Sequence, residues 1–398
     1  MIRYSLKIII KIIAIIILLC GFQIQSVFAC KYNVRETGFV DLGSESYFIN
    51  LYIDQNSPKE IISSFQQIAS ELLDDSNIKT QVININFERN NVAVKYLNVW
   101  NIKSLPAVLL VSPDGQSIFL PVDFQKQLFE QSFDKIVKDI LFSPVKKHIL
   151  KEVIRTYGVV LLIEGKSDAD NNRAKVAVNR AIQNIQNKMV FLPKPIKHPP
   201  ELVSVPNQLI KNEKILLWSL GIDSEQIEEP IVAVIYGRSR WIGPLFIGEK
   251  IISDNLSAIL ITIGLDCECG LDKSWMQGTM LPVKWDQQIQ SRVAKNLGFD
   301  PENPMIKMEI NRILRMGSSH PGVPMTIINE YLKPDSSKQN IGEPPSKEKN
   351  LDSSQSANST DQVENSTLVL SLYLIFGLSI LTFAIGLFIF IKKKNRNN

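Results

Sequence analysis

A block of residues appears twice in this chain, and the order of its parts limits the folds that the sequence can adopt. Each copy begins with a proline and continues with branched apolar residues, a turn, a second apolar segment and an amphipathic segment. The first copy begins at Pro106 and its apolar run covers 107–111, whereas the second begins at Pro230 and its run covers 231–235. Short apolar runs bounded by turn residues are typical of strands buried on both faces of a sheet.

The segments before each proline extend this repeat. In the first copy the pattern predicts strands at 47–53, 81–87, 107–111 and 117–122, and helices from Ser57-Pro58, at 92–97 and at 124–141. In the second copy it predicts strands at 158–163, 231–235 and 241–247, and helices at 171–189, 209–220 and 253–263. The second strand of this copy falls in the proline-rich stretch 192–206, where prolines weaken a strand. Two further helices are expected at 286–297 and 305–316.

The order strand, helix, strand, helix, strand, strand, helix resembles the thioredoxin fold. In that family a proline that is cis begins the third strand, which makes Pro106 and Pro230 the cis-proline candidates of this chain. The resemblance implies an α/β fold class with tandem thioredoxin-like units. We expect the first strand of the second unit to run parallel to 231–235.

The cysteines that make a thioredoxin an enzyme are missing from both copies. After the first strand of each copy, where the family keeps them, this chain has Asp54-Gln55-Asn56-Ser57 and Glu164-Gly165-Lys166-Ser167. No Ser-His-Asp set and no phosphate-binding glycine loop is present either. The sequence therefore favours a binding or scaffold module over an enzyme, and it implies no cofactor.

The cysteines outside the predicted leader are Cys30, Cys267 and Cys269, and three interpretations of them stay open. Cys30 can form a structural disulfide with one of the other two in an oxidising compartment. Cys267 and Cys269 can instead form a redox pair, although Asp266 and Glu268 disfavour a reactive thiolate. The third interpretation is a copper site, because six methionines and His320 lie within 276–325 and soft sulfur donors suit Cu(I).

Both ends of the sequence carry membrane signals. Arg3, Lys7 and Lys11 precede an apolar run, and Ala29 closes a small-residue motif, which predicts a secretory signal peptide over 1–29. The alternatives are an uncleaved anchor and a lipid on Cys30. Residues 368–391 form an uncharged stretch that is long enough to span a bilayer. Four basic residues follow it within 392–398. This layout predicts a single transmembrane helix with a cytoplasmic C-terminus.

The net charge of the chain belongs to these ends. The total is +4, but three basic residues lie in the leader and four in the tail, with no acid in either, which leaves −3 for residues 30–391. There is no basic surface of the kind that nucleic acid requires. The partners we predict are the membrane and a protein at the cell envelope, most simply a bacterial one.

These observations divide the chain into seven parts. We predict a signal peptide (1–29), a first thioredoxin-like unit with a short lead (30–145), a divergent second unit (146–270), a small helical extension (271–332), a flexible tether (333–366), a transmembrane helix (367–391) and a basic tail (392–398). The function predicted is a membrane-anchored, extracytoplasmic scaffold, and the alternative is thiol–disulfide or copper handling by Cys267 and Cys269.

Overall fold

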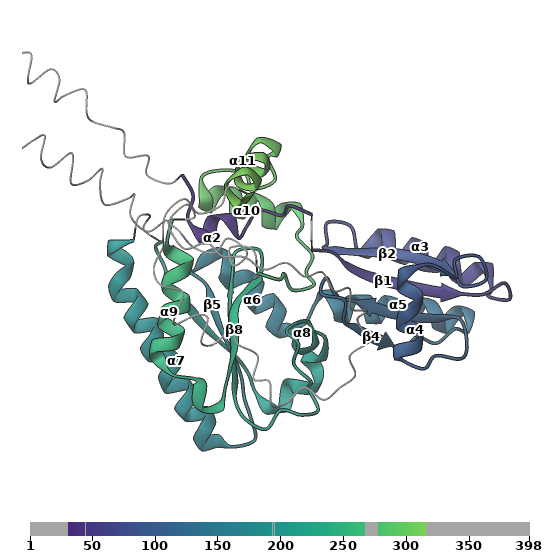
Figure 1. Ribbon diagram of the computed structural model, residues 1–398, viewed down its shortest axis with the longest axis horizontal. Coiled ribbons are helices and arrows are strands. Elements are labelled where there is room, and N and C mark those ends of the chain that lie inside the picture. The colour runs from purple at the N-terminus through teal and green to yellow at the C-terminus, as the bar shows by residue number, and fades with distance from the viewer. Residues whose placement is uncertain (1–30, 44, 193, 195, 267–277, 316–398) are drawn as a thin grey trace, which may run out of the picture. The chain divides into compact units, whose positions relative to one another are not determined.

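The computed structural model describes residues 31–43, 45–192, 194, 196–266 and 278–315 (Figure 1). The first unit contains a four-stranded sheet in the order β2-β1-β3-β4. Its elements are β1 (Tyr47–Ile53), α3 (Lys59–Leu72), β2 (Ile78–Asn84), α4 (Lys95–Val99), β3 (Ala107–Val111), β4 (Ser117–Leu120) and α5 (Lys126–Leu141).

The second unit repeats this arrangement in a second four-stranded sheet, with the order β6-β5-β7-β8. Its elements are α6 (Pro144–Arg155), β5 (Val159–Ile163), α7 (Asp168–Lys188), β6 (Glu201–Val205), α8 (Lys214–Ser219), β7 (Ile231–Tyr236), β8 (Arg240–Ile247) and α9 (Ser253–Gly264). In each sheet the first two strands are parallel, and the third is antiparallel to both of its neighbours. Both units are therefore thioredoxin-like, as the sequence predicted.

One expectation about strand direction is wrong. β5 is antiparallel to β7, with Val159 opposite Ile235 and Ile163 opposite Ile231. β1 and β3 pair in the same antiparallel way in the first unit. The long helices α3 and α7 return the chain to the end of the sheet at which the first strand began, so the first two strands are parallel. The connections that contain α4 and α8 instead enter the third strand at the end where the second strand stops, so the third strand is antiparallel to the first.

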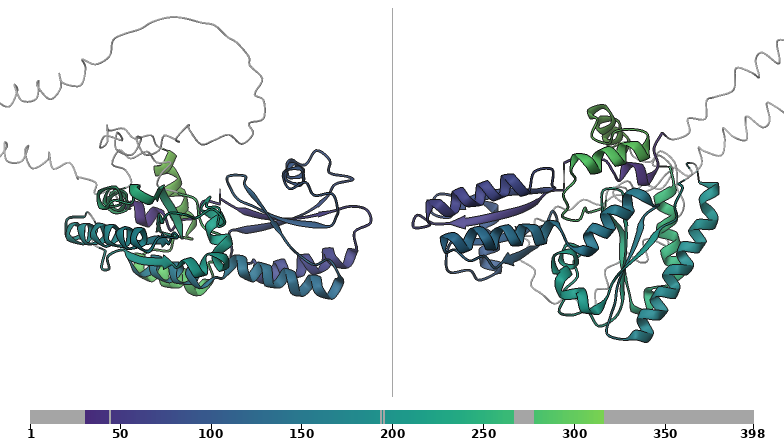
Figure 2. Two further views of the ribbon diagram at one scale, coloured as in Figure 1. Left: turned by 90° about the horizontal axis from the view of Figure 1, so that it is seen from below. Right: turned by 180° about the vertical axis from the view of Figure 1, so that it is seen from behind.

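The buried strands explain why the repeat is visible in the sequence. Every residue of β3, β5 and β7 is buried, so these strands are apolar on both faces. On one face of the first sheet lie the long helices α3 and α5, and on the other only short turns around α4 (Figure 2). The apolar cluster under α3 and α5 is accordingly much larger than the cluster under α4.

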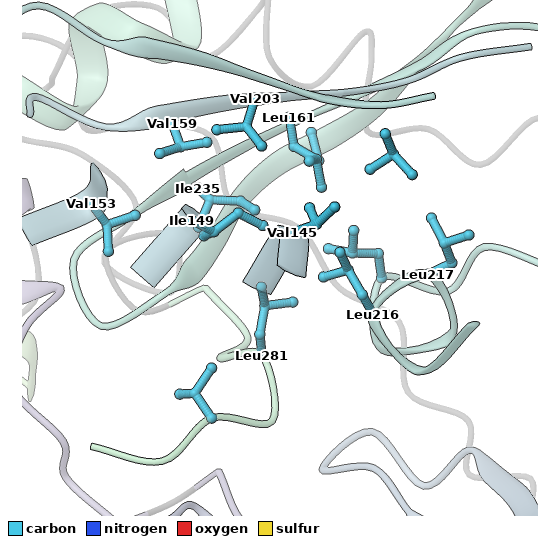
Figure 3. Packing of buried hydrophobic residues seen from close by; sticks show 14 of the residues in the cluster. Val145, Ile149, Val153, Val159, Leu161, Val203, Leu216, Leu217, Ile235 and Leu281 are labelled. Carbon is cyan, nitrogen blue, oxygen red and sulfur yellow. The ribbon is translucent and has the colours of Figure 1, made fainter. Parts of the chain in front are cut away.

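Helix α6 connects the two units and had no counterpart among the predicted elements. Ser143 caps it by accepting a hydrogen bond from Lys146 N (3.1 Å), and Pro144 occupies its first turn. Its apolar face, with Val145, Ile149 and Val153, packs against β5, β6 and β7 (Figure 3). The helix thus closes one face of the second sheet.

The segments before and after the two units pack on the second unit. Helix α2 (Val34–Thr37) carries Arg35, which is buried and donates hydrogen bonds to the carbonyls of Val153, Ile154 and Thr156 at the end of α6. Helix α10 (Gln287–Leu297) adds Ile289 and Val293 to the cluster around α6, and α11 (Pro304–Arg315) adds Ile310 and Ile313 to the cluster on the opposite face of the sheet. The lead that the sequence grouped with the first unit therefore contacts the second.

A short extended segment, residues 279–285, joins the two units, and we call it the strap. Asn77 of the first unit donates to Leu281 O (3.0 Å) and accepts from Val283 N (3.0 Å). Trp285 N donates to Asp75 O at 2.7 Å. On its other side, Leu281 N donates to Ser239 O (3.0 Å) in the second unit. Both units are held by backbone hydrogen bonds to the same strap.

The predicted membrane segments lie outside the described residues, as do the tether and the tail. Among the helices that the structure describes, none combines the length and apolar character needed to cross a membrane.

Candidate functional site

The edge of the first sheet where β1 and β2 end corresponds to the place where the thioredoxin family keeps its cysteines. Because β1 and β2 are parallel, the loop after Ile53 and the loop after Asn84 leave the same edge. Tyr52 pairs with Ala107, so Pro106 lies at this edge as well. The Leu105–Pro106 peptide bond is cis. Three backbone segments thus meet here.

The loop after β1 is closed by its own polar groups. The Ser57 hydroxyl donates to Asp54 Oδ1 at 2.8 Å and accepts from Asp54 N at 3.0 Å. Asn56 N donates to Asp54 Oδ1 (3.0 Å), and Gln55 N donates to Asn86 Oδ1 (3.0 Å) across the edge. Asp54 therefore organises a tight turn that leads into α3, which is a structural use of a carboxylate.

This loop offers no nucleophile for thiol chemistry. It contains no sulfur, and the Ser57 hydroxyl donates its hydrogen bond directly to the carboxylate of Asp54, without an imidazole between them. The histidines that the structure describes, His148 and His198, lie on α6 and just before β6 instead. Disulfide exchange needs a thiolate, so the loop cannot perform the family's reaction.

The matching edge of the second sheet is closed by close packing. Gly165 exchanges hydrogen bonds with the side chain of Asn171 (2.8 and 3.1 Å), and Lys166 N donates to Glu228 O at 2.9 Å. A Cβ at Gly165 would lie 2.5 Å from Glu228 O and 2.7 Å from Pro230 N. The backbone before β7 therefore seals the loop where a ligand or a thiol would have to lie.

The expectation that Pro230 is cis is wrong. The Leu105–Pro106 bond is the only cis peptide bond in the described part of the chain. Residues 228–230 are fixed instead by the hydrogen bond from Lys166 N and by the contact with Gly165, and Gly248 N donates to Pro230 O at 2.9 Å. The two copies of the block share their strand order and not their proline geometry.

Cys30, Cys267 and Cys269 lie outside the described residues, but Lys31, next to Cys30, and Asp266, next to Cys267, are described. Asn33 and Asp266 form an antiparallel bridge, and Val34 N donates to Leu265 O at 2.9 Å. The lead and the end of α9 are therefore neighbours. The described residues nearest to Cys30 and Cys267 belong to these two paired segments.

Of the residues in the copper interpretation, Met280, Met305 and Met308 are among the described residues, whereas Cys267, Cys269 and His320 are not. Met305 and Met308 are 70% and 66% exposed on α11, whereas Ile310 and Ile313 carry its buried face. Met305 and Met308 therefore lie on the surface of α11. Among the described residues no group of three or more histidine, cysteine, aspartate or glutamate side chains is arranged to hold a metal ion.

The face of the first sheet around α4 exposes large apolar side chains that the sequence patterns did not single out. Val92 and Val99 are 75% and 71% exposed, and Trp100 lies 6.5 Å from the ring of Phe119. We call Val92, Val99, Trp100 and Phe119 the α4 face. A helix as short as α4 covers little of the sheet, which leaves Phe119 of β4 in contact with solvent.

Comparisons with known proteins give structural likeness alone. No protein-family model and no curated protein matches the chain.

The solved structures that resemble it include thioredoxin domains of other proteins. The first two thioredoxin domains of Saccharomyces cerevisiae Eps1p are 13% identical, with 58% of this chain and 97% of that chain covered and a TM-score of 0.19. The zinc-bound form of human ERp44 is 8% identical, with 64% and 63% covered and a TM-score of 0.21. The NTD_N/C domain of alkylhydroperoxide reductase AhpF from Enterococcus faecalis is 13% identical, with 49% and 86% covered and a TM-score of 0.18. The assignment of a thioredoxin-like fold therefore rests on the topology of the two sheets.

Proposed function

We propose that this chain is a membrane-anchored, extracytoplasmic binding or scaffold module built on two redox-inactive thioredoxin-like units. The observation that carries the proposal is the state of the two sheet edges. The first is closed by the Asp54–Ser57 turn, and the second by the packing of Gly165 against residues 228–230. A fold kept without its reactive residues, and with an uncovered apolar face, suits a protein that holds partners.

The anchor and the location are part of the same proposal. They are supported by the sequence, in which an uncharged stretch at 368–391 is followed by basic residues and the N-terminus has the layout of a secretory signal. The proposed location is a cell envelope, with the described part outside the cytoplasm. The proposed partners are the membrane and a protein of that envelope.

The α4 face is the surface through which we expect the first unit to contact a protein. Aromatic side chains are enriched at the energetic centres of interfaces, and Trp100 is the only exposed tryptophan among the described residues. A photocrosslinking residue at Val99 tests this in the cells that make the protein, and Gln67, exposed on α3 at the opposite face of the sheet, is the matched control. A discrete crosslinked protein from Val99 and not from Gln67 is expected. Equal crosslinking from both positions contradicts the proposal.

The alternative function is thiol–disulfide or copper handling by Cys267 and Cys269. The Asn33–Asp266 bridge supports this alternative, because the bridge brings the described flanks of Cys30 and Cys267 together. Reduction of a small reporter disulfide by the purified full chain separates the two proposals. We expect no activity above buffer, with no change in the Cys267→Ser/Cys269→Ser variant. A rate that this variant abolishes, or stoichiometric Cu(I) binding that it abolishes, would establish the alternative.

A further inference from the structure

A cleft of about 730 Å³ lies where the end of α5, helix α6, the strap and α10 meet. Six of its thirteen lining residues are basic, and they come from α6, from the strap and from α10: Lys146, Lys147, His148, Lys151, Lys284 and Arg292. Its volume is within the range of sites that hold small molecules or short peptide segments. Neither sheet edge described above contributes to it.

The charge of this cleft is poorly balanced. Asp286 is the only carboxylate among the lining residues, and it caps α10 by accepting from Ile289 N at 2.9 Å. Lys151 is 3.5 Å from Glu152, but that carboxylate is already bound by Arg155. Within the described part of the chain, no ion pair involves Lys147 or Arg292, and both are exposed. Lys147 and Arg292 therefore present cationic groups that no described carboxylate pairs with.

The basic groups of the cleft come from three different segments of the chain. Lys147 and Lys151 are one turn apart on α6, which corresponds to a rise of about 6 Å along the helix. Arg292 comes from α10, which packs beside α6, and Lys284 comes from the strap, where its Nζ donates to Leu72 O at 3.1 Å. A single phosphate is bound by donors that converge on it, whereas spaced cations match carboxylates spaced along a chain.

Apolar side chains complete the lining. Phe142, at the end of α5, is 48% exposed, and Leu72 and Leu150 are half-buried. An exposed aromatic ring beside cations offers contact area to a ligand that carries apolar groups as well as negative charge. An acidic peptide with an apolar side chain combines the two.

We propose that this cleft binds an extended acidic segment of a partner protein, with its carboxylates against Lys147, Lys151 and Arg292 and an apolar side chain against Phe142. The inference rests on the proposed function in that the ligand is a protein, but it concerns a separate surface. Binding to the cleft can fail while crosslinking from the α4 face succeeds, and the reverse also holds, so that the two proposals fail separately.

The test uses the full chain in neutral detergent and a fluorescein-labelled octapeptide, Glu-Leu-Glu-Glu-Phe-Glu-Gly-Glu, followed by fluorescence anisotropy. We expect binding at least about tenfold tighter than that of the same peptide with glutamine in place of glutamate, and weaker binding as salt rises. The Lys147→Glu/Arg292→Glu variant should lose about tenfold or more. Lys79→Glu/Lys211→Glu makes the same change of charge at exposed positions outside the cleft and is expected to bind within about twofold of the unchanged protein.

Three outcomes would overturn the proposal. They are equal affinity for the glutamine peptide, equal loss in both charge-reversed variants, and displacement of the peptide by inorganic phosphate at a concentration where chloride of equal ionic strength does not displace it. The last would indicate a site for small anions. If thermal melts show that the reversed variant does not fold, Lys147→Gln/Arg292→Gln replaces it, with a loss of about threefold expected and unchanged affinity counting against the proposal.

Discussion

Asn33 and Asp266 pair as an antiparallel bridge, although Asn33 lies in the lead before the first unit and Asp266 follows α9 of the second unit. The bridge is supported by the hydrogen bond from Val34 N to Leu265 O. Cys30 precedes Asn33 by three positions and Cys269 follows Asp266 by three, with Cys267 in between. The bridge therefore places the described residues nearest to Cys30 and Cys267 on neighbouring segments.

We therefore predict a disulfide between Cys30 and either Cys267 or Cys269. Peptide mapping of the protein digested without reduction should yield a linked peptide that contains Cys30. The Cys267→Ser/Cys269→Ser variant should lose about 2–5 kcal/mol of unfolding free energy, the usual effect of removing a native bridge. Three titratable thiols in the native protein, or a lipid on Cys30, would contradict this prediction.

Arg240 is a second connection between distant segments, and its removal should be severe. It is 1% exposed, donates to the carbonyls of Gly38, Val40 and Gly278, and lies 3.2 Å from Glu45. Arg240→Met leaves these acceptors without their donor, and we expect a loss of about 3–5 kcal/mol in unfolding free energy by denaturant titration.

The matched control for Arg240 is Arg173→Met, because Arg173 pairs with Asp170 on the exposed face of α7. A surface pair of this kind contributes at most about 0.5 kcal/mol. Similar losses in both variants would show that the buried network around Arg240 is not important for stability.

The strand pattern of this protein could be predicted because its most buried strands are apolar on both faces, as in β3, β5 and β7. Boundaries were less accurate. The alternation of Ile83, Ile85 and Phe87 suggested a strand at 81–87, but β2 ends at Asn84. There the Asn84 side chain accepts from Asn86 N and its carbonyl accepts from Glu88 N, which turns the chain away from the sheet. A polar residue that ends a strand in this way is hard to distinguish from one that faces solvent.

The functional surfaces could not be predicted in the same way. The basic cleft takes Lys147 from α6, Lys284 from the strap and Arg292 from α10, and these segments meet only through the packing of the extension on the second unit. Helix α6 did carry local signals, a serine cap and a proline in the first turn at Ser143-Pro144. The closure of the second sheet edge depends on the contact between Gly165 and residues 228–230, which no periodicity reveals.

The anchor can be tested by truncation. We expect a chain ending before Leu368 to leave the membrane fraction, because the uncharged stretch 368–391 supplies the apolar length needed to span a bilayer. Fractionation followed by carbonate extraction measures this, with the full chain as the control. Retention of the truncated chain in the membrane would mean that the N-terminal segment or a lipid on Cys30 anchors it. Removal of the tether alone should leave the chain in the membrane.

The last prediction concerns the pH dependence of stability that Lys146 imposes. Lys146 is 2% exposed and donates to the Ile140 carbonyl; burial lowers its pKa from 10.5 to about 7, although the carboxylates of Glu213 and Asp139 act in the opposite direction. Between these two pH values the unfolded chain holds a proton that the folded chain has lost. The unfolding free energy should therefore rise with pH from about 7 to about 10.5, by up to about 1.4 kcal/mol per pH unit. Lys146→Met should remove this rise, so the stability difference between wild type and variant should change in favour of the wild type across that range.

Denaturant titrations at half-unit pH steps measure this difference, with Lys147→Met as the control for loss of an exposed lysine from the same helical turn. A difference between wild type and Lys146→Met that stays constant across this pH range would contradict the prediction.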